Sequence, residues 1–337
     1  MREQEYKDLE LIKSSLPKIE HTIMRDEADY YGISQLIAKK LSLLLKPKSF
    51  AGWKHGWLYM DLKYVEQLTG GNKIHKLFLV AKKEQALFLK EKGFNAQAVG
   101  MPFIYADELD NVEIKRYKNS LLVMPPHSLP YTSHSWSEDT YAKNISELKE
   151  DFNLIVVCLH YSCVQKNLWI DAFKKYDIPY VIGADATDKN SLIRMSRLFR
   201  SFEYMTTNAI GSHVVYASYS GCKVSVYGEY QEYTLDDYKE DKSYQKVPFL
   251  LDYNLKAQSE KNVRHLFPFL FTHPKEAQLY QHWAEEELGK SNLLSLKKLS
   301  VLLGWTWKLQ LEYLFIGIPK KIISKIQRKP TITQNKY

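Results

Sequence analysis

Cysteine is scarce in this chain, with three among 337 residues. An odd and sparse set argues against a disulfide framework, and Cys158 and Cys222 lie in apolar, strand-like segments where a reduced thiol packs as a small hydrophobe. No apolar run reaches the roughly 18 residues that a membrane-spanning helix needs. The first 21 residues are charged and hold no apolar signal core. We therefore expect a cytoplasmic protein without disulfides.

Several short motifs that indicate a reaction are also missing. There is no GxGxxG turn and no Walker loop, which disfavours a dinucleotide oxidoreductase and a P-loop phosphotransferase. A GxSxG elbow is absent too, and no two histidines have the spacing of a helical zinc motif. The net charge of +8 comes without an Arg-rich run or an RNA-binding aromatic signature. We expect no metal, no cofactor and no nucleic-acid partner.

The mild positive charge leaves two interpretations open. It suits a protein that contacts phosphates or an anionic membrane surface, and it is equally ordinary for a protein with no anionic partner. The sequence from 313 to 330 sharpens the question, because four isoleucines can share one helix face while lysines and arginines flank it. Such a segment can lie on an anionic leaflet, or it can pack back on the protein with its lysines in water.

What the chain has in plenty is apolar residues arranged in alternating strands and helices. Hydrophobic residues make up 45% and aromatic residues 13% of the chain, which is ample for packed cores. In the second half the predicted strands are 120–124, 153–160, 178–184, 203–207 and 223–228, and the predicted helices are 137–152, 164–177, 188–202 and the segment that begins at Gly211. Ser137 is the expected N-cap of the first of these helices. The alternation predicts a parallel sheet covered on both faces, which is a Rossmann-like domain.

The first half is less regular. A helical pattern runs from about residue 30 to the proline at 47. It is followed by a predicted strand at 76–81, a helix at 82–93 and a strand at 95–106 that runs into a Gly-Met-Pro turn. A polar stretch near residue 115 marks the predicted domain boundary, and 229–270 are polar, tyrosine-rich and irregular. We therefore expect an α/β protein with domains at 1–115 and 116–305 and a basic amphipathic tail at 306–337.

Polar or small residues follow the predicted strands of the second half. They are His127, Ser128, Ser133 and His134 after the first strand, Tyr161, Ser162 and Cys163 after the second, Asp185 after the third, and Asn208, Gly211 and Ser212 after the fourth. Because the carboxyl ends of parallel strands meet at one edge, we expect these residues to converge on one crevice. His127 follows two prolines and can bond a phosphate or a ribose from a stiff loop, whereas His134, His160 and His213 are weaker candidates.

Gly211 and Ser212 stand where a helix begins, and two roles fit them. The unpaired N–H groups and the positive dipole end of a helix can seat an anion, with glycine allowing close approach and serine adding a hydroxyl. Alternatively, Ser212 caps the helix and Gly211 serves a tight turn. The predicted convergence with His127 and Ser128 favours the phosphate seat.

In the first half, two tryptophans surround His55, with Asp61 six residues further on. An imidazole titrates near neutrality, so His55 can serve as a general base, and it can equally be a structural histidine. Asp26, Glu27 and Asp29 are alternative carboxylate bases or ordinary residues of a helix start.

Four stretches of the chain together resemble bacterial GT-B glycosyltransferases of surface polysaccharide assembly, including the capsule-type and the nonulosonate or Kdo transferase-like groups. They are HGW at 55–57, VGMPFIYA at 99–106, MPPHS at 124–128 and the stretch 206–228. The resemblance covers roughly residues 50–305 in order. It implies two Rossmann-like domains that face each other across a cleft, the C-terminal one binding a nucleotide sugar and the N-terminal one binding the acceptor and supplying the base.

Carried over by position, the resemblance assigns residues to both sides of the cleft. The donor site would be lined by His127, Ser128, Asn208, Gly211, Ser212 and His213. The acidic contact to the ribose would come from Glu229 or Glu232. The acceptor would be faced by His55, with Asp61 or a neighbouring carboxylate. The implied reaction is metal-independent transfer of a sugar from a nucleotide-sugar donor to a glycan or lipid-linked acceptor in capsule or O-antigen synthesis, at the inner face of the plasma membrane. Alternatives are a nucleotide-sugar epimerase or hydrolase of the same fold, and a non-catalytic scaffold of a polysaccharide assembly complex.

Overall fold

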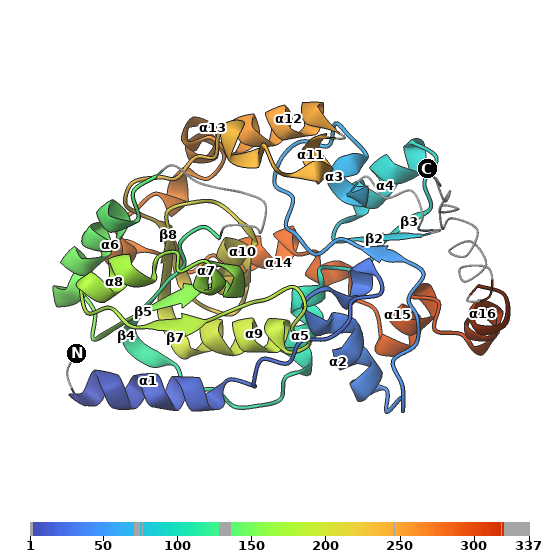
Figure 1. The fold of residues 1–337 in the computed structure, drawn as a ribbon, viewed down its shortest axis with the longest axis horizontal. Coiled ribbons are helices and arrows are strands. Elements are labelled where there is room, and N and C mark those ends of the chain that lie inside the picture. Colours follow the sequence, from blue (N-terminus) through green and yellow to red (C-terminus); the bar gives the residue numbers. More distant parts are fainter. Residues whose placement is uncertain are drawn as a thin grey trace, which may run out of the picture.

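The chain folds around two parallel sheets, as the computed structural model shows for residues 3–70, 75, 77–127, 136–245, 247–317 and 319 (Figure 1). The first sheet has the order β1-β2-β3, and the second has the order β6-β5-β4-β7-β8. The strands are β1 (Gly52–Trp53), β2 (Phe78–Val80), β3 (Ala96–Ala98), β4 (Tyr117–Val123), β5 (Leu154–Leu159), β6 (Tyr180–Ile182), β7 (Phe202–Thr207) and β8 (Lys223–Val226). The α/β class with two Rossmann-like sheets is confirmed.

The second sheet matches the predicted alternation closely. All of its neighbouring strands pair in parallel, with β4 central between β5 and β7. Between them lie α6 (Glu138–Ser146), α7 (Tyr161–Gln165), α8 (Ile170–Lys175), α9 (Ser191–Ser201) and α10 (Ser212–Tyr219). Ser137 caps α6 as predicted, because its side chain accepts a hydrogen bond from the backbone N–H of Thr140. The one helix expected at 164–177 is instead the end of α7 and the separate α8.

The two faces of the second sheet carry separate apolar cores. On β4, Leu122 packs into the core that includes residues of α5 (Pro102–Leu109), α9 and α10, whereas Leu121 and Val123 pack into the core that includes α6 and α8. Successive side chains of a strand point to opposite faces, so this division follows directly from the pleat. β5, which lies inside the sheet, is accordingly apolar and buried along its whole length, as expected for a parallel strand covered on both faces.

The first sheet is small, and the chain near it departs from the sequence prediction at two places. Its helices are α3 (Glu66–Thr69) and α4 (Lys83–Glu91), and Gly93 follows α4 in the left-handed region at φ +83°. The strand predicted at 95–106 ends at Ala98, and the segment from Pro102 onward is α5. Proline at the first helical position lacks only an N–H that would have no intrahelical partner, so this sequence suits a helix start better than a strand.

The second departure is at α2 (Ile33–Lys40), which was predicted to continue to the proline at 47. The helix ends at Lys40, and Ser42 takes a left-handed conformation at φ +55°. As a result, Leu44 and Leu45 do not continue the buried stripe of Ile33 and Ile37, and their relative exposures are 101% and 84%. The helical spacing of these leucines was therefore misleading.

The stretch 229–270, predicted to be irregular, also holds regular helices. They are α11 (Lys242–Gln245), α12 (Pro248–Gln258) and α13 (Glu260–Leu266). Ser259 caps α13 by accepting from the backbone N–H of Asn262. Further on lie α14 (Gln281–Glu287), α15 (Leu296–Leu302) and α16 (Trp307–Glu312). The high polarity and tyrosine content of this stretch hid its helical pattern.

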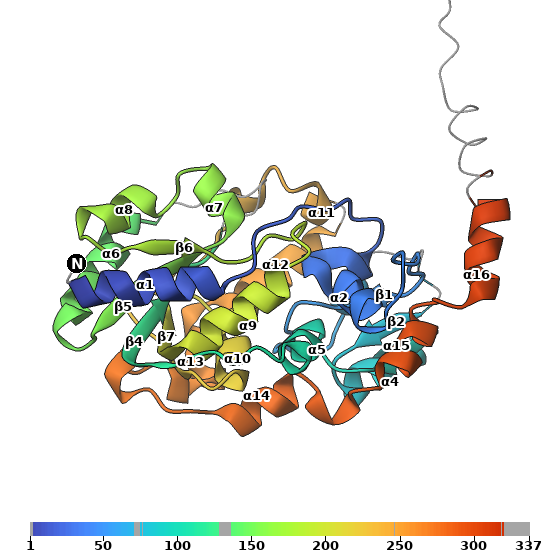
Figure 2. The same cartoon turned by 90° about the horizontal axis from the view of Figure 1, so that it is seen from below.

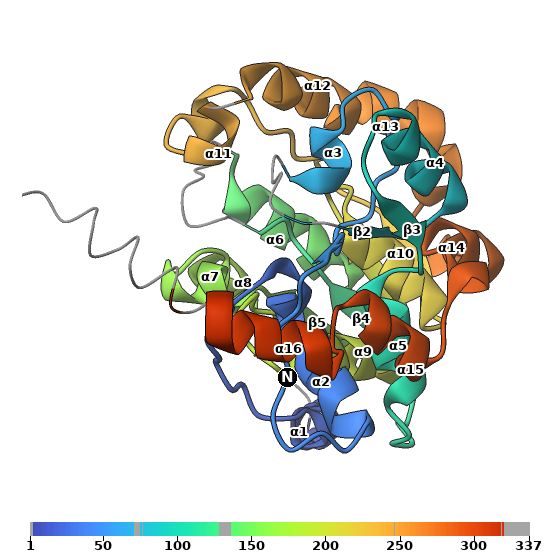
Figure 3. The ribbon, with the colours of Figure 1, turned by 90° about the vertical axis from the view of Figure 1, so that its right-hand side faces the viewer.

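The chain crosses between the two sheets more than once. Helix α1 (Glu3–Ser15) lies along α9 beside the second sheet (Figure 2), and the Arg197 guanidinium donates to the carbonyl of Ser15 at 2.6 Å. After α14 the chain returns to the first sheet, where the Met101 N–H donates to the carbonyl of Leu288 at 2.9 Å. Helices α15 and α16 then lie at the end of the molecule that holds α2 (Figure 3). Most of the predicted tail lies outside the described residues.

Candidate functional site

Three histidines follow strands of the second sheet and form what we call the strand-exit cluster: His127 after β4, His160 after β5 and His213 after β7. The ring centroids of His127 and His160 are 4.8 Å apart. His160 Nδ1 lies 2.7 Å from Ser162 Oγ, and His213 Nε2 lies 3.0 Å from Thr207 Oγ1. The topology thus brings together side chains up to 86 positions apart, in the region where parallel sheets bind ligands.

His160 and His213 of this cluster are neutral at pH 7, because the pKa of each lies well below the ordinary 6.5. Burial, together with the neighbouring charge of His127, lowers the pKa of His160 to about 3. The same two causes, in the same order, lower the pKa of His213 to about 3. Desolvation also lowers the pKa of His127. These imidazoles therefore serve as neutral hydrogen-bonding groups, so the net charge to hold an anion has to come from elsewhere, such as the start of α10.

His213 lies in the first turn of α10, and Gly211 is the N-cap residue of this helix. Gly211 has an extended backbone, φ −178°, which any residue could adopt, so backbone freedom is not its reason. Instead, a Cβ at this position would come within 3.0 Å of the His213 ring. The missing side chain makes room for that imidazole within the first turn. There the Val214 N–H donates to the Gly211 carbonyl at 3.1 Å, which leaves the Ser212 and His213 N–H groups as the ones without an acceptor in the helix.

Ser212 does not cap α10, so the capping alternative for this residue is wrong. Its Oγ accepts a hydrogen bond from the backbone N–H of Trp57 at 2.9 Å. One turn later, the Tyr216 hydroxyl donates to the carbonyl of His55 at 2.7 Å. The helix that begins after Gly211 is thereby fastened to the chain that follows β1, so Ser212 and Tyr216 lie close to His55 and Trp57.

Asn208 is buried, and its side-chain amide oxygen forms no hydrogen bond with a described residue. Its Nδ2 donates to the carbonyl of Glu229 at 3.0 Å, and its own carbonyl accepts from the N–H of Gln231 at 2.8 Å. Its Oδ1 is buried and has no hydrogen-bond partner in the described part of the chain. Glu229 contributes its backbone here, while the residue itself is exposed. No described contact brings the Glu229 carboxylate to the strand-exit cluster.

His55 lies against two tyrosines just ahead of α2. Its ring centroid is 4.8 Å from that of Tyr30 and 5.4 Å from that of Tyr31. Burial, and next the charge of Lys54, lowers the pKa of His55 to about 4, so the imidazole is neutral at pH 7. Its Nδ1 is buried and has no hydrogen-bond partner among the described residues. A buried nitrogen without a hydrogen-bond partner is uncommon, which makes His55 Nδ1 a candidate for a ligand contact.

Tyr31 links His55 to the second sheet, and the sequence reasoning missed it. Its backbone is left-handed at φ +58°, an unfavourable region for a bulky residue, and its N–H donates to the carbonyl of Ala186 at 2.9 Å. Burial, and next the charge of Asp185, raises the pKa of its hydroxyl to about 12. Strained residues of this kind gather at functional sites. The sequence feature that could have pointed to Tyr31 is the Tyr-Tyr-Gly run directly before an apolar helix.

Of the three alternative carboxylates, two are bound in ion pairs. Asp26 contacts Lys48 Nζ at 2.8 Å, and Asp29 contacts Lys46 Nζ at 2.6 Å. Glu27 Oε2 lies 3.5 Å from His75 Nε2. Burial raises the pKa of this carboxyl, although the charge of Lys54 acts in the opposite direction. A Cβ at Gly52 would come within 2.7 Å of the Glu27 carboxylate, so the glycine in β1 leaves space for that group. Glu27 is thus the one of the three carboxylates whose described ion-pair partner is a histidine and not a lysine.

Other predicted residues stand apart from this arrangement. Asp61 is exposed; its backbone carbonyl accepts from Gln67 and from Tyr253, and no described contact brings its carboxylate to His55. Ser128, Ser133 and His134 lie outside the described residues.

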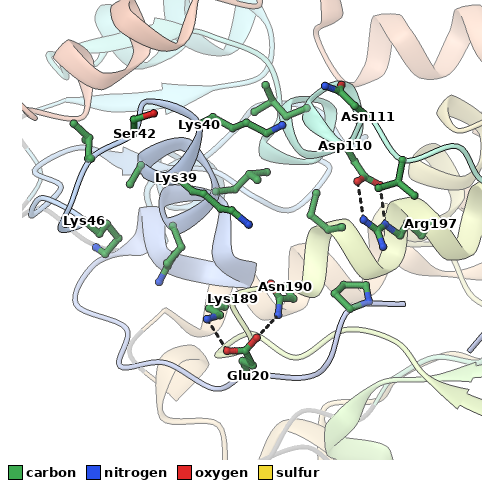
Figure 4. A pocket seen from close by; sticks show the side chains of 18 of the residues that line it. Glu20, Lys39, Lys40, Ser42, Lys46, Asp110, Asn111, Lys189, Asn190 and Arg197 are labelled. Atoms are coloured by element: carbon green, nitrogen blue, oxygen red, sulfur yellow. Dashed lines mark hydrogen bonds and ion pairs between the residues drawn. The ribbon is translucent and has the colours of Figure 1, made fainter. Parts of the chain in front are cut away.

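Two further properties concern the described residues as a group. Within them, no set of three or more His, Cys, Asp or Glu side chains could hold a metal ion. Nor is any helix of this part of the chain long and apolar enough to cross a membrane. A cavity of about 920 Å³ lies away from the strand-exit cluster, between α2 and α9 (Figure 4).

The comparisons with known proteins give only distant likenesses. No family model and no curated protein matches the chain. Similar solved structures include S. aureus TarM, at 12% identity and TM-score 0.29 over 75% of this chain and 50% of that one. A trehalose 6-phosphate synthase from Burkholderia multivorans gives 10% identity and TM-score 0.33 over 90% and 77% of the two chains. WaaG, a glycosyltransferase involved in lipopolysaccharide biosynthesis, gives 11% identity and TM-score 0.30 over 85% and 86%.

This chain spans half the length of TarM. At TM-scores of 0.29–0.33 the overlaps are loose, so the function is argued from the residues of this chain.

Proposed function

We propose that the protein is a metal-independent glycosyltransferase that moves a sugar from a nucleotide-sugar donor to a glycan or lipid-linked acceptor in bacterial surface polysaccharide synthesis. The observation that carries the proposal is the pair of hydrogen bonds that fasten α10 to the chain after β1. Ser212 Oγ accepts from the Trp57 N–H at 2.9 Å, and the Tyr216 hydroxyl donates to the His55 carbonyl at 2.7 Å. A phosphate bound at the start of α10 would therefore lie close to His55.

On the donor side, the start of α10 supplies the groups that a phosphate needs. The N–H groups of its first turn and the dipole of the helix favour an anion. His213 and His160 are neutral, so they would donate hydrogen bonds to phosphate or ribose oxygens without adding charge. The Asn208 Oδ1, buried without a partner in the described residues, would accept from a hydroxyl or an amino group of the nucleotide.

On the acceptor side, His55 would take the proton. An acceptor hydroxyl attacks the anomeric carbon, the bond from that carbon to the phosphate oxygen breaks, and the nucleotide leaves with the bonding electrons. The acceptor proton passes to His55 Nδ1, which is neutral at pH 7 and has no hydrogen-bond partner among the described residues. Glu27 is the second candidate for this base. The N–H groups at the start of α10 stabilise the charge that develops on the leaving phosphate.

The first test is a thermal-shift screen of the full chain against UDP-, GDP-, CMP- and dTDP-sugars. A ligand at a hundred times its Kd stabilises a protein by about 2.7 kcal/mol, which such a screen resolves. We expect one nucleotide class to stabilise the wild type and His213→Ala to weaken that effect. His282→Ala is the matched control, because the His282 side chain is 86% exposed. If the wild-type protein binds none of these nucleotides, the proposal is wrong.

A second measurement separates transfer from other chemistry on the same donor. The purified protein is incubated with its stabilising nucleotide sugar, with and without lipid-linked or glycan acceptors. A transferase releases nucleotide at a rate that depends on acceptor. Conversion of the donor with no acceptor present would indicate an epimerase or hydrolase, and a bound donor that never reacts would indicate the scaffold role.

A further inference from the structure

The loop after α2 exposes apolar side chains beside lysines. Leu44 is 101% and Leu45 84% exposed, although both are large apolar residues. Immediately before the loop, Lys39 and Lys40 end α2, and both are exposed. Single exposed leucines are normal on a protein surface, but two adjacent ones on a projecting loop are a feature that needs a reason.

A second apolar segment lies next to this loop. From α16 to Gly317 several large side chains are exposed, among them Trp307 at 77% and Phe315 at 76%. Two hydrogen bonds join the segment to the chain after the loop: the Lys48 N–H donates to Gln310 Oε1 at 3.0 Å, and Gln310 Nε2 donates to the Lys48 carbonyl at 2.9 Å. Helices α2 and α16 lie at the same end of the molecule in all three ribbon views (Figures 1, 2 and 3).

The positive charges at this end are of two kinds. Lys46, Lys189 and Arg197 are paired, with Asp29, Glu20 and Asp110 respectively. Lys39 and Lys40 form no ion pair with any described residue. Both line the cavity of about 920 Å³, into which apolar side chains such as Leu36, Leu43 and Ile193 also face. Figure 4 shows the two lysines extending from α2 on the side of the pocket opposite Arg197.

We propose that this end of the molecule, which we call the docking end, binds the surface of an anionic lipid bilayer. The docking end comprises Lys39, Lys40, Leu44, Leu45 and the segment 307–317. The leucines and the aromatic residues enter the boundary between headgroups and acyl chains, and the two lysines contact lipid phosphates at the mouth of the cavity. Tryptophan is favoured at that boundary because its ring is apolar and its N–H is polar.

A second copy of the chain fits this surface less well. In a symmetric dimer both copies bury the same patch, so one interface would contain Lys39 and Lys40 from each copy, which are four like charges. An anionic leaflet offers opposite charge and apolar volume together.

Docking in this way would bring the candidate site near the membrane. Helix α2 has eight residues, which corresponds to a length of about 12 Å. Its first residue, Ile33, follows the tyrosines that contact His55, and its last residue is Lys40. The arrangement suits a lipid-linked acceptor, but the docking itself rests on the exposed residues and not on the proposed transferase activity.

The test is flotation of the full chain with lipid vesicles. One set of vesicles is pure phosphatidylcholine, and the other contains phosphatidylglycerol in addition. We expect the wild type to float with the anionic vesicles and not with the neutral ones. The double substitution Leu44→Ser with Leu45→Ser, and separately Lys39→Gln with Lys40→Gln, should each weaken the vesicle partition coefficient on the order of tenfold.

The matched controls are on α4, which lies away from α2 in Figures 1 and 3. They are Leu87→Ser, a leucine that is 58% exposed, and the charge-matched double substitution Lys90→Gln with Lys92→Gln, of which Lys92 is the C-cap residue of α4. Both controls should float as the wild type does. Thermal melts and the nucleotide screen on every variant show that the fold is intact and keep this test separate from the proposed activity.

Three results would overturn the inference. The first is no binding of the wild type to anionic vesicles. The second is loss of binding when residues 318–337 are deleted, with no effect of the docking-end substitutions, which would assign the membrane contact to the tail. The third is a dimer in size-exclusion chromatography that Leu44→Ser with Leu45→Ser dissociates, which would make this surface an interface between copies.

Discussion

The hydroxyl oxygen of Ser212 accepts a hydrogen bond of 2.9 Å from the backbone N–H of Trp57, across 155 positions of the sequence. The Trp57 side chain is itself buried and donates from its indole N–H to the Glu287 carboxylate at 2.7 Å. The turn after His55 is thus held from two directions, by the start of α10 and by the end of α14. These two bonds therefore join α10 and α14 to the chain that follows β1.

Replacing Ser212 by alanine should destabilise the protein by about 1–3 kcal/mol, because the partly buried Trp57 N–H loses its acceptor. Urea unfolding followed by tryptophan fluorescence measures this change in the free energy of unfolding. Ser14→Ala is the control, since the Ser14 hydroxyl bonds only the Leu11 carbonyl on an exposed face of α1. If both substitutions lowered the free energy of unfolding equally, the Ser212 hydrogen bond would not stabilise the protein more than an exposed one does.

Gly211→Ala should disturb His213, because the added Cβ would lie within 3.0 Å of that ring. Overpacking of this kind costs about 1–3 kcal/mol, and losing a glycine N-cap adds a smaller cost. The N-cap cost remains when His213 is alanine, but the clash does not. We therefore expect a smaller effect of Gly211→Ala in the His213→Ala background, measured as a double-mutant cycle by urea unfolding. Additive effects would mean that the ring moves aside freely.

Stability should fall as the pH is lowered from neutrality. The pKa of His213 is about 3 in the folded protein, below the ordinary 6.5, mainly through burial. Between these values the unfolded chain binds a proton that the folded chain does not, so acid favours unfolding. The loss is up to about 1.4 kcal/mol per pH unit for each such histidine.

Urea unfolding at pH 7 and pH 5 tests this linkage with three variants. His213→Gln should reduce the pH dependence, whereas His282→Gln, at a side chain that is 86% exposed, should not. His160→Gln should act as His213→Gln does, because burial also lowers the pKa of His160 to about 3. The same pH dependence in all three variants would contradict the neutral state of the strand-exit cluster.

The second sheet was predictable because its signal is local and redundant. Each strand is a short apolar run, and polar turns separate it from an amphipathic helix, so parallel order and the clustering of strand exits follow from chain geometry. The His127 and His160 rings, 4.8 Å apart, are the outcome. The cap at Ser137 was equally local. Such features need no knowledge of the rest of the fold.

The features that were missed depend on tertiary contacts. Leu44 and Leu45 continue the spacing of Ile33 and Ile37, but no described element covers them, so periodicity alone could not show that α2 ends at Lys40. The left-handed Tyr31 is held by the Ala186 carbonyl, which comes from the other half of the chain. Glu27 could not be separated from Asp26 and Asp29 until their lysine partners were known.

The identity of the base can be decided by the pH dependence of kcat/KM once a donor and an acceptor are found. The pKa of His55 is about 4, so a reaction that uses it should stay level from pH 8 down to about pH 5 and fall below that. His55→Ala should lower kcat/KM by about 10²–10⁴. Burial raises the pKa of Glu27 above 4.5, so a reaction that uses this carboxylate would lose activity at a higher pH than an unperturbed glutamate. A fall that persists in His55→Ala and disappears in Glu27→Gln would assign the base to Glu27 and leave His55 a positioning role through its carbonyl bond to Tyr216.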